Sequence, residues 1–454
     1  MTGWRDLLGR RHLGASVVLA GGVLLYATNE FLTISLLPSA VHQIGGERFY
    51  AWVTTVYLVA SVVSATTVSA LVARLGPRAA YLWSLGFFAI GSVGCALAPS
   101  MELLLVGRVV QGAAGGALAG LGYAVINLSL PQSLWPKASA LVSAMWGAGT
   151  VLGPASGGLF AQIGLWRWAF GALTILTAVV ALLVPVSLPG RSADRGAVPW
   201  RIPLWSLLIL GGAALAISAA GVQDAMAPMS VLLAAGVALV VVFVIVDRRL
   251  AVGVLPKTAF GPGPFKWNYL TLGLLMAATM ANMYVPLFGQ RSAHLAPLAA
   301  GFLGVALSIG WTTGEIASAS VTSPVRVVRI VRFGPWIMAA GLAVAAVSQR
   351  DDAAPGTVAL WSMALLVAGA GVGMAWPHLS AWAMGGVDDP SEGAVAAAAI
   401  STVQLICGAF GAGLAGVVVN ALGRTDAVGA GWLFAVFAAV AAVTGFASYR
   451  AGAR

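Results

Sequence analysis

The feature that most constrains this chain is a succession of long apolar runs. Fourteen such runs, most of them near twenty residues long, follow one another with short polar stretches between them. About twenty apolar residues are the length of one helix across a bilayer. The sequence therefore predicts a polytopic membrane protein with fourteen transmembrane helices. The runs lie at roughly 14–38, 51–73, 79–98, 103–127, 139–163, 168–188, 202–222, 229–246, 268–288, 297–321, 334–349, 356–378, 393–420 and 429–449.

The composition excludes a soluble protein. Of the 454 residues, 60% are hydrophobic and only 8% are charged, whereas soluble domains contain about 25% charged residues. So few charges cannot cover a surface that faces water. A β-barrel is disfavoured because its spans would be about ten residues of alternating polarity. The predicted fold class is therefore all-α.

The basic residues predict the orientation of the chain. If the N-terminus is cytoplasmic, eighteen Lys and Arg residues fall in cytoplasmic segments and five fall outside. Cytoplasmic loops of membrane proteins are enriched in these residues. We therefore expect a multi-pass protein of the cell inner (plasma) membrane with both termini in the cytoplasm. The same bias explains the net charge of +10, so no nucleic-acid partner is expected.

A weak internal repeat divides the chain. The segment Arg74–Pro77 recurs 258 residues later as Arg332–Pro335, and the same offset places Gly153 on Gly411. This offset pairs the first six runs with the last six and leaves two runs between them. We expect a six-helix bundle over residues 1–188, linkers with two additional helices over 189–267, and a second six-helix bundle over 268–454.

Two motifs resemble those of the major facilitator superfamily. Arg108-x-x-Gln111-Gly112 is similar to the R-x-x-Q-G motif of that superfamily, and residues 149–158 resemble the G-x-x-x-G-P-x-x-G-G motif of drug antiporters. Six plus two plus six helices is the arrangement of the 14-helix drug:proton antiporters. The resemblance implies the major facilitator fold, with parallel six-helix repeats. It also implies proton-coupled export by alternating access.

The predicted gating residues belong to two segments. Glycines at this spacing make a smooth helix face that neighbouring helices can approach, and a proline bends a helix. A bent, glycine-faced helix suits an interface between two moving halves, although ordinary small-residue packing would give the same pattern. The segment after the second run resembles the superfamily's gating loop, with Ala73 where that family has an aspartate. The gating residues are Gly149, Gly153, Pro154, Gly157, Gly158, Arg74, Gly76 and Arg78.

Three charged residues inside the runs are candidates for proton coupling. A buried charge in a membrane is costly and therefore indicates function. Arg108 is then either a proton-relay partner or a contact for an anionic substrate, unless its long side chain reaches the outer interface of the membrane. Burial favours the neutral form of a carboxyl group, so Glu30 could bind and release a proton, although an acid hydrogen-bonded purely for structure is the alternative. Glu30 directly follows Asn29, which occupies the position of the family's aspartate. Glu315 is predicted to act in proton coupling or substrate contact, or to be an interfacial acid.

Ten polar and aromatic residues of the runs are candidates for the substrate cavity, although each alone is more often a packing residue or an interfacial anchor. They are Tyr26, Asn29, Thr33, Tyr57, Gln111, Tyr123, Trp146, Asn282, Tyr284 and Gln404. We expect a small hydrophobic or lipid-like substrate, the lipid bilayer and protons as partners, and a monomer. A multidrug substrate is favoured over a lipid or glycolipid, import of small metabolites is less favoured, and a membrane-embedded enzyme or non-transporting receptor is the least favoured alternative.

No enzyme or cofactor is expected. The sequence lacks a glycine-rich loop followed by Lys-Ser/Thr, so ATP does not drive transport directly. Four scattered histidines and two cysteines show no metal-ligand spacing. The proton gradient is the expected source of energy.

Overall fold

The computed structural model describes most of the chain as helices. The described residues are 4–9, 12–129, 131, 134–188, 190, 203–250, 253–261, 263–319, 321, 323–385 and 393–452. Within these ranges no strand occurs, so the all-helical prediction is confirmed there. Twelve helices among the described residues are long and apolar enough to cross a membrane. The prediction of fourteen spans stays a prediction.

The chain divides into two compact units. Unit 1 comprises Met1–Gly46 and Val56–Ile202, and unit 2 comprises Glu47–Thr55 and Pro203–Arg454. The helix α3 (Tyr50–Leu97) is therefore divided between the units. Its first residues belong to unit 2 and the rest to unit 1.

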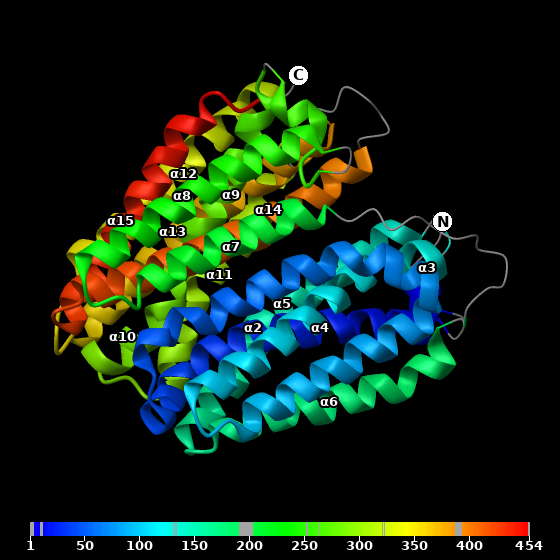
Figure 1. The fold of residues 1–454 in the computed structure, drawn as a ribbon, viewed down its shortest axis with the longest axis horizontal. Helices are drawn as coiled ribbons and strands as arrows, with labels where there is room; N and C mark the ends of the chain where they lie inside the picture. The colour runs from blue at the N-terminus through cyan, green and yellow to red at the C-terminus, as the bar shows by residue number, and fades with distance from the viewer. Residues whose placement is uncertain are drawn as a thin grey trace. The chain divides into compact units, whose positions relative to one another are not determined.

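Unit 1 is a helical bundle (Figure 1). In this bundle α2 contacts α4, α5 and α6, and its contact with α5 is the most extensive. The short α1 is tied to α2 because the Ser16 hydroxyl donates to the Leu7 carbonyl at 3.0 Å. The helices of unit 1 besides the shared α3 are α1 (Trp4–Leu7), α2 (Leu13–Ile44), α4 (Met101–Ser129), α5 (Trp135–Gln162) and α6 (Trp166–Ser187).

Unit 2 is a second and larger helical bundle, whose paired helices can be followed in Figure 1. Its main contacts join α11 to α13, α12 to α13 and α15, and α7 to α8 and α14. Its α-helices are α7 (Leu204–Ala220), α8 (Met226–Arg249), α9 (Phe265–Thr279), α10 (Val285–Ser292), α11 (Pro297–Ala319), α12 (Pro324–Val347), α13 (Pro355–Gly385), α14 (Gly393–Leu422) and α15 (Asp426–Ser448). The 3₁₀ turns are η1 (Glu47–Phe49), η3 (Lys257–Phe260) and η4 (Met280–Tyr284).

Local sequence explains several helix starts in unit 2. The helices α11, α12 and α13 each begin with a proline, whose fixed φ and missing N–H suit the first helical position. Helix α15 is capped by Thr425, whose hydroxyl accepts from the Val428 N–H at 3.3 Å. Such a cap satisfies a backbone donor that the helix itself leaves unpaired.

The helices differ from the predicted apolar runs at two places. The runs 51–73 and 79–98 form the single helix α3, which is broken by non-helical backbone at Gly76 (φ 78°, ψ 163°). The run 268–288 is divided into α9, the 3₁₀ turn η4 and α10. The break lies between Thr279 and Val285 and contains Asn282.

Candidate functional site

The central feature of unit 1 is the buried guanidinium of Arg108 on α4. The side chain is 1% exposed. Its Nη1 donates to Gln111 Oε1 at 2.9 Å, to Thr33 Oγ1 at 3.2 Å and to Asn29 Oδ1 at 3.4 Å. Arg108 and Gln111 lie three residues apart on one helix face. The structure therefore brings four of the predicted site residues together across α2 and α4.

Aromatic rings extend this cluster to α3 and α5. The Tyr57 ring lies under the guanidinium, with its centroid 4.1 Å from Arg108 Cζ. A cation over an aromatic face is stabilised by the ring's negative charge density. Tyr26 stacks on Tyr57 at 5.9 Å and meets Trp146 edge-on at 5.4 Å. Four helices of unit 1 thus contribute to the Arg108 cluster, which we define as Tyr26, Asn29, Thr33, Tyr57, Arg108, Gln111 and Trp146.

A close approach of α4 to α3 holds Tyr57 in place. A Cβ added to Gly112 would overlap the backbone carbonyl of Tyr57. The glycine of the R-x-x-Q-G motif is therefore the residue that lets the two backbones meet. Gln111 is held in turn by Ser92, because its amide donates to the Ser92 hydroxyl at 2.8 Å. Sequence reasoning did not single out Ser92, a small polar residue in an apolar run.

Glu30 is placed beside the Arg108 cluster but not within its hydrogen bonds. It is partly exposed on α2, directly after Asn29. Among the described residues no hydrogen bond or ion pair joins its carboxylate to a partner, yet it interacts electrostatically with Arg108. This arrangement lets the charge of one group act on the other.

The glycine motif of α5 faces the helix that holds Asn29 and Glu30. A Cβ on Gly149 would lie 2.5 Å from the Ala27 Cβ, and one on Gly153 would lie 2.5 Å from the Phe31 Cβ. Both distances are shorter than any ordinary carbon contact, so only glycine allows this approach. Gly157 meets the Leu32 carbonyl in the same way, and Gly158 is buried. The Pro154 carbonyl accepts a hydrogen bond from the Ser35 hydroxyl at 3.4 Å.

The predicted gating residues of α3 surround its break. Gly76 has a φ of 78°, a conformation that side-chain-bearing residues adopt at a cost. Arg78 donates from Nε to the Leu188 carbonyl at 3.0 Å. Arg74 is exposed and precedes the break by two residues.

The remaining predicted residues lie in unit 2, except for Tyr123, which belongs to unit 1. Glu315 accepts a hydrogen bond from the Trp311 indole at 3.1 Å, and Trp311 contacts Trp376 with ring centroids 5.1 Å apart. The side chain of Tyr123 lies outside the described residues. Gln404 is partly exposed on α14.

Two predicted residues of unit 2 occupy the break after α9. The Asn282 amide donates to the Gly304 carbonyl at 3.0 Å. Tyr284 stacks on Tyr50 at 4.7 Å and on Phe288 at 5.9 Å. These contacts fix the irregular backbone where a regular helix would have closed its own hydrogen bonds.

The described residues contain no group of three or more His, Cys, Asp or Glu side chains that could hold a metal ion. Cys95 is buried and Cys407 is partly buried, and both are free thiols. The arrangement in unit 1 is instead a buried cation, neutral hydrogen-bond acceptors, stacked aromatic rings and one neighbouring carboxylate. In this arrangement the charge of the carboxylate acts on the buried guanidinium.

Comparisons with known proteins give a family and several relatives. The sequence model of the Major Facilitator Superfamily matches residues 19–412. A "Probable multidrug-efflux transporter" of Mycobacterium tuberculosis is 57% identical over 454 residues, covering 99% of this chain and 96% of that one. The "Multidrug transporter protein MdtP" of Bacillus subtilis is 25% identical over 391 residues, covering 85% of this chain and 71% of that one.

Solved structures share the fold. A bacterial homologue of the human lysosomal transporter Spinster aligns with a TM-score of 0.69 at 14% identity, covering 97% of this chain and 98% of that one. The D-xylose-proton symporter aligns with a TM-score of 0.67 at 16% identity, covering 97% and 98%. At these identities the likeness concerns the fold alone.

Proposed function

The chain belongs to the Major Facilitator Superfamily, and from this premise we propose that it is a multidrug exporter driven by the proton gradient. The relative at 57% identity is named for multidrug efflux and is matched over nearly its whole length. A second relative named for multidrug transport is matched over 71% of its length. These relatives are transporters and not enzymes.

The Arg108 cluster supports the proton coupling in this proposal. Glu30 is the proton site, and its protonation removes the negative charge that interacts with Arg108. Arg108 stays charged in both states of Glu30. Its electrostatic attraction to Glu30 is therefore present when Glu30 is ionised and lost when Glu30 is protonated. That difference is what a transporter needs if protonation is to favour one conformation over another. The single observation on which the proposal depends is this buried guanidinium next to a carboxylate that makes no hydrogen bond to any described residue.

The aromatic part of the cluster supports a hydrophobic or amphiphilic substrate. Tyr26, Tyr57 and Trp146 have flat apolar faces, and Asn29 and Gln111 add a small number of polar groups. Ligand sites of this kind combine apolar walls with a small number of polar groups. Glu315 with Trp311 and Trp376 forms a second acid and aromatic group in unit 2, and we assign it to substrate contact or to a second proton.

The proposed topology has fourteen spans in a six-two-six arrangement, with residues 1–188 and 268–454 as the two bundles and 189–267 as the inserted part. Helix α7 has 17 residues, so it is about 26 Å long, close to the thickness of the hydrocarbon core. The distribution of basic residues supports a cytoplasmic position for both termini, with the protein in the inner membrane of the cell. The transporter acts as a monomer and uses no cofactor.

The proposal is tested with purified protein in liposomes that contain a trapped fluorescent lipophilic dye. An imposed pH gradient should drive dye movement, and a protonophore that collapses the gradient should stop it. Transfer of a labelled glycolipid is measured in the same vesicles. Gradient-driven movement of the glycolipid but not of the dye would replace the multidrug assignment with a lipid one, and movement of neither would refute the proposal.

A further inference from the structure

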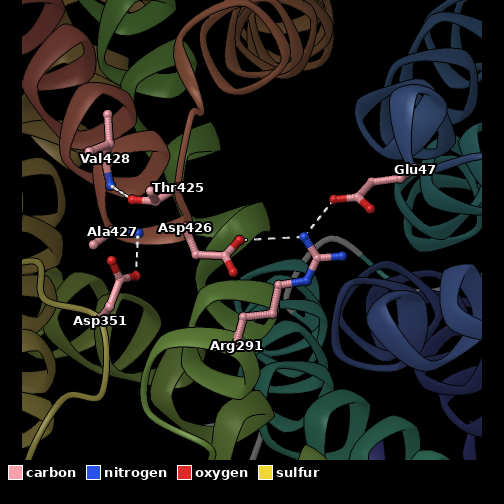
Figure 2. Close-up of polar contacts among 7 residues, drawn as sticks. All are labelled: Glu47, Arg291, Asp351, Thr425, Asp426, Ala427 and Val428. Atoms are coloured by element: carbon pink, nitrogen blue, oxygen red, sulfur yellow. Dashed lines mark hydrogen bonds and ion pairs between the residues drawn. The ribbon is translucent and has the colours of Figure 1, made fainter.

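The basic residues at the two ends of unit 2 differ in their partners. At the end where α15 starts, cations are paired with carboxylates. Figure 2 shows Arg291 of α10 between Glu47 and Asp426, with its Nη1 2.5 Å and 3.4 Å from the two carboxylates. Nearby in the sequence, His294 Nε2 lies 2.7 Å from an oxygen of Asp352. These basic groups have their acidic partners within the unit.

The arginines at the other end of α15 lack such partners. Arg326, Arg329 and Arg332 follow one another at intervals of three along the first turns of α12, so they lie on one side of that helix. The end of α15 lies against this part of α12, because the Ser448 hydroxyl donates to the Arg332 carbonyl at 3.5 Å. In the part of the chain that the structure describes, no ion pair joins any of the three arginines to a carboxylate. This side of α12 therefore carries three positive charges without a described acidic partner.

Arg332 is held in a position from which it can bind an anion. Its guanidinium lies over the Tyr449 ring, with Cζ 5.3 Å from the ring centroid. A guanidinium stacked on an aromatic face keeps its donors at the edge of its plane, where they can reach an acceptor. Its Nε is shielded from solvent and has no hydrogen-bond partner among the described residues. A shielded donor without an acceptor is costly, so an anion bound here would supply a contact that the described residues do not.

An apolar surface begins one helical turn away from these charges. Trp336, four residues after Arg332, meets the Phe446 ring edge-on at 5.0 Å. Phe446 is 68% exposed and Phe333 is 55% exposed. Gly445 allows this packing, because a Cβ there would lie 2.5 Å from the Trp336 indole. The seam between α12 and α15 thus has positive charge at the start of α12 and exposed aromatic rings directly beyond it.

This order of groups matches one class of ligand. A phospholipid has an anionic phosphate at one end and acyl chains that begin a few atoms away. The guanidinium donors of arginine fit phosphate oxygens in pairs, and basic pockets between transmembrane helices bind anionic lipid headgroups. A free phosphate would use only the charges, and a neutral apolar compound would use only the rings. The seam combines both kinds of group in the order in which a lipid presents them.

We propose that the seam between α12 and α15 binds an anionic phospholipid. The phosphate binds at Arg329 and Arg332, and the first part of an acyl chain lies against Trp336 and Phe446. In the proposed topology the start of α12 is at the cytoplasmic face, and the negative surface of that leaflet attracts basic segments. The site is confined to unit 2 and goes beyond the export activity proposed above, on which it does not depend.

The test measures lipid binding by native mass spectrometry of the purified protein, titrated with phosphatidylglycerol or with zwitterionic phosphatidylcholine. The parent protein should bind phosphatidylglycerol more tightly. Arg332→Gln should weaken that binding by about fivefold, the factor that one basic residue contributes near an anionic lipid surface. The double variant Arg329→Gln with Arg332→Gln should bind the two lipids about equally. Equal binding of both lipids by the parent protein, or unchanged phosphatidylglycerol binding in the double variant, would overturn the proposal.

Arg450→Gln is the matched control for the position of the site. Arg450 is exposed and also lies over an aromatic ring, but that ring is Trp267 of α9, at 4.9 Å, and not a residue of the seam. Its replacement removes the same charge from the same end of α15. Phosphatidylglycerol binding should therefore fall less than in Arg332→Gln. An equal loss in the two variants would show general attraction by positive charge and would overturn the assignment to the seam.

Two measurements on the unaltered protein complete the test, so it does not depend on the folding of any variant. Inorganic phosphate in large excess should leave phosphatidylglycerol bound, because it cannot contact the aromatic rings; displacement would identify a site for a free anion and overturn the lipid assignment. Phosphatidylglycerol with a photoreactive group on an acyl chain should crosslink to peptides that contain Trp336 or Phe446, and crosslinks confined to other helices would contradict the proposal. None of these measurements uses a transported compound, so a failure of drug export would refute the proposed function and leave this inference intact.

Discussion

The hydrogen bonds of Arg108 go to neutral oxygens of Asn29, Thr33 and Gln111. Such oxygens satisfy the donors of a buried guanidinium without cancelling its charge. Glu30, the residue after Asn29 on α2, interacts electrostatically with that charge. At the scale of single residues, coupling therefore depends on one permanent cation and one carboxyl group that can gain or lose a proton.

Replacement of Arg108 should affect both the rate and the pH profile of export. Arg108→Ala removes several hydrogen bonds to a charged group, each worth about 1.5–3 kcal/mol, so export should fall at least about tenfold. It also removes the positive charge near Glu30. The pH optimum of export should therefore move to the alkaline side.

Arg108→Lys is the matched comparison for this prediction. It keeps the positive charge but loses the planar set of donors, so we expect partial export with the optimum near that of the wild type. The measurement is a pH–rate profile of each variant in liposomes. Profiles of identical position for wild type and Arg108→Ala would show that Arg108 does not act on a titrating group.

The break in α3 gives a prediction about stability. Gly76 has φ 78° and ψ 163°, a region in which side-chain-bearing residues are strained by about 1–3 kcal/mol. Gly76→Ala should therefore lower the thermal unfolding midpoint. Gly86→Ala is the control, because Gly86 lies in the same helix with open space around its Cα and should be neutral or slightly stabilising. Equal unfolding midpoints for both variants would show that a side chain at position 76 does not strain the backbone of the break.

At the scale of elements, the contact of α5 with α2 positions Asn29 and Glu30. Gly153→Ala would place a methyl group 2.5 Å from the Phe31 Cβ, and overpacking of this kind costs about 1–3 kcal/mol. We expect slower export and lower thermal stability. Gly147→Ala on the same helix meets nothing within 4 Å and should have little effect. Export at the wild-type rate by Gly153→Ala would show that this approach of α5 is not needed for transport.

The elements themselves were largely predictable, but their interruptions were not. Apolar runs of the right length indicate helices whatever their partners are, which is why the run 103–127 corresponds to α4 (Met101–Ser129). The break after Thr279 depends on tertiary contacts such as that of Asn282 with Gly304. A hydropathy pattern has no information about such contacts, because they join residues that are distant in the sequence.

At the scale of the whole molecule, the proposed fourteen-span topology is tested most directly at the turn between α7 and α8. With fourteen spans this turn lies outside the cell, and the end of α8 lies inside. Gln223→Cys and Arg249→Cys are both at exposed positions. An impermeant thiol reagent should label Gln223→Cys in intact cells and Arg249→Cys only after permeabilisation. Labelling of Gln223→Cys only after permeabilisation would exclude the inserted pair as two membrane spans.

The candidate site was predictable to the extent that it follows helical spacing. Arg108 and Gln111 share a face of one helix, and Asn29 and Thr33 share a face of another. The partnership of these two helices, and the ion pair of Arg291 with Glu47, join positions far apart in the chain. Arg291 lies in the last turn of the short helix α10, and its local sequence contains no signal for its partners.

The central claim is that Glu30 couples export to protons, and one variant tests it most directly. Glu30→Gln keeps the size and polarity of the side chain but cannot bind and release a proton. In liposomes it should lose gradient-driven export of a lipophilic dye while retaining exchange of internal for external dye without a gradient. Glu102→Gln, which removes an exposed carboxylate at the start of α4, should keep both activities. Gradient-driven export by Glu30→Gln at the wild-type rate would contradict the account.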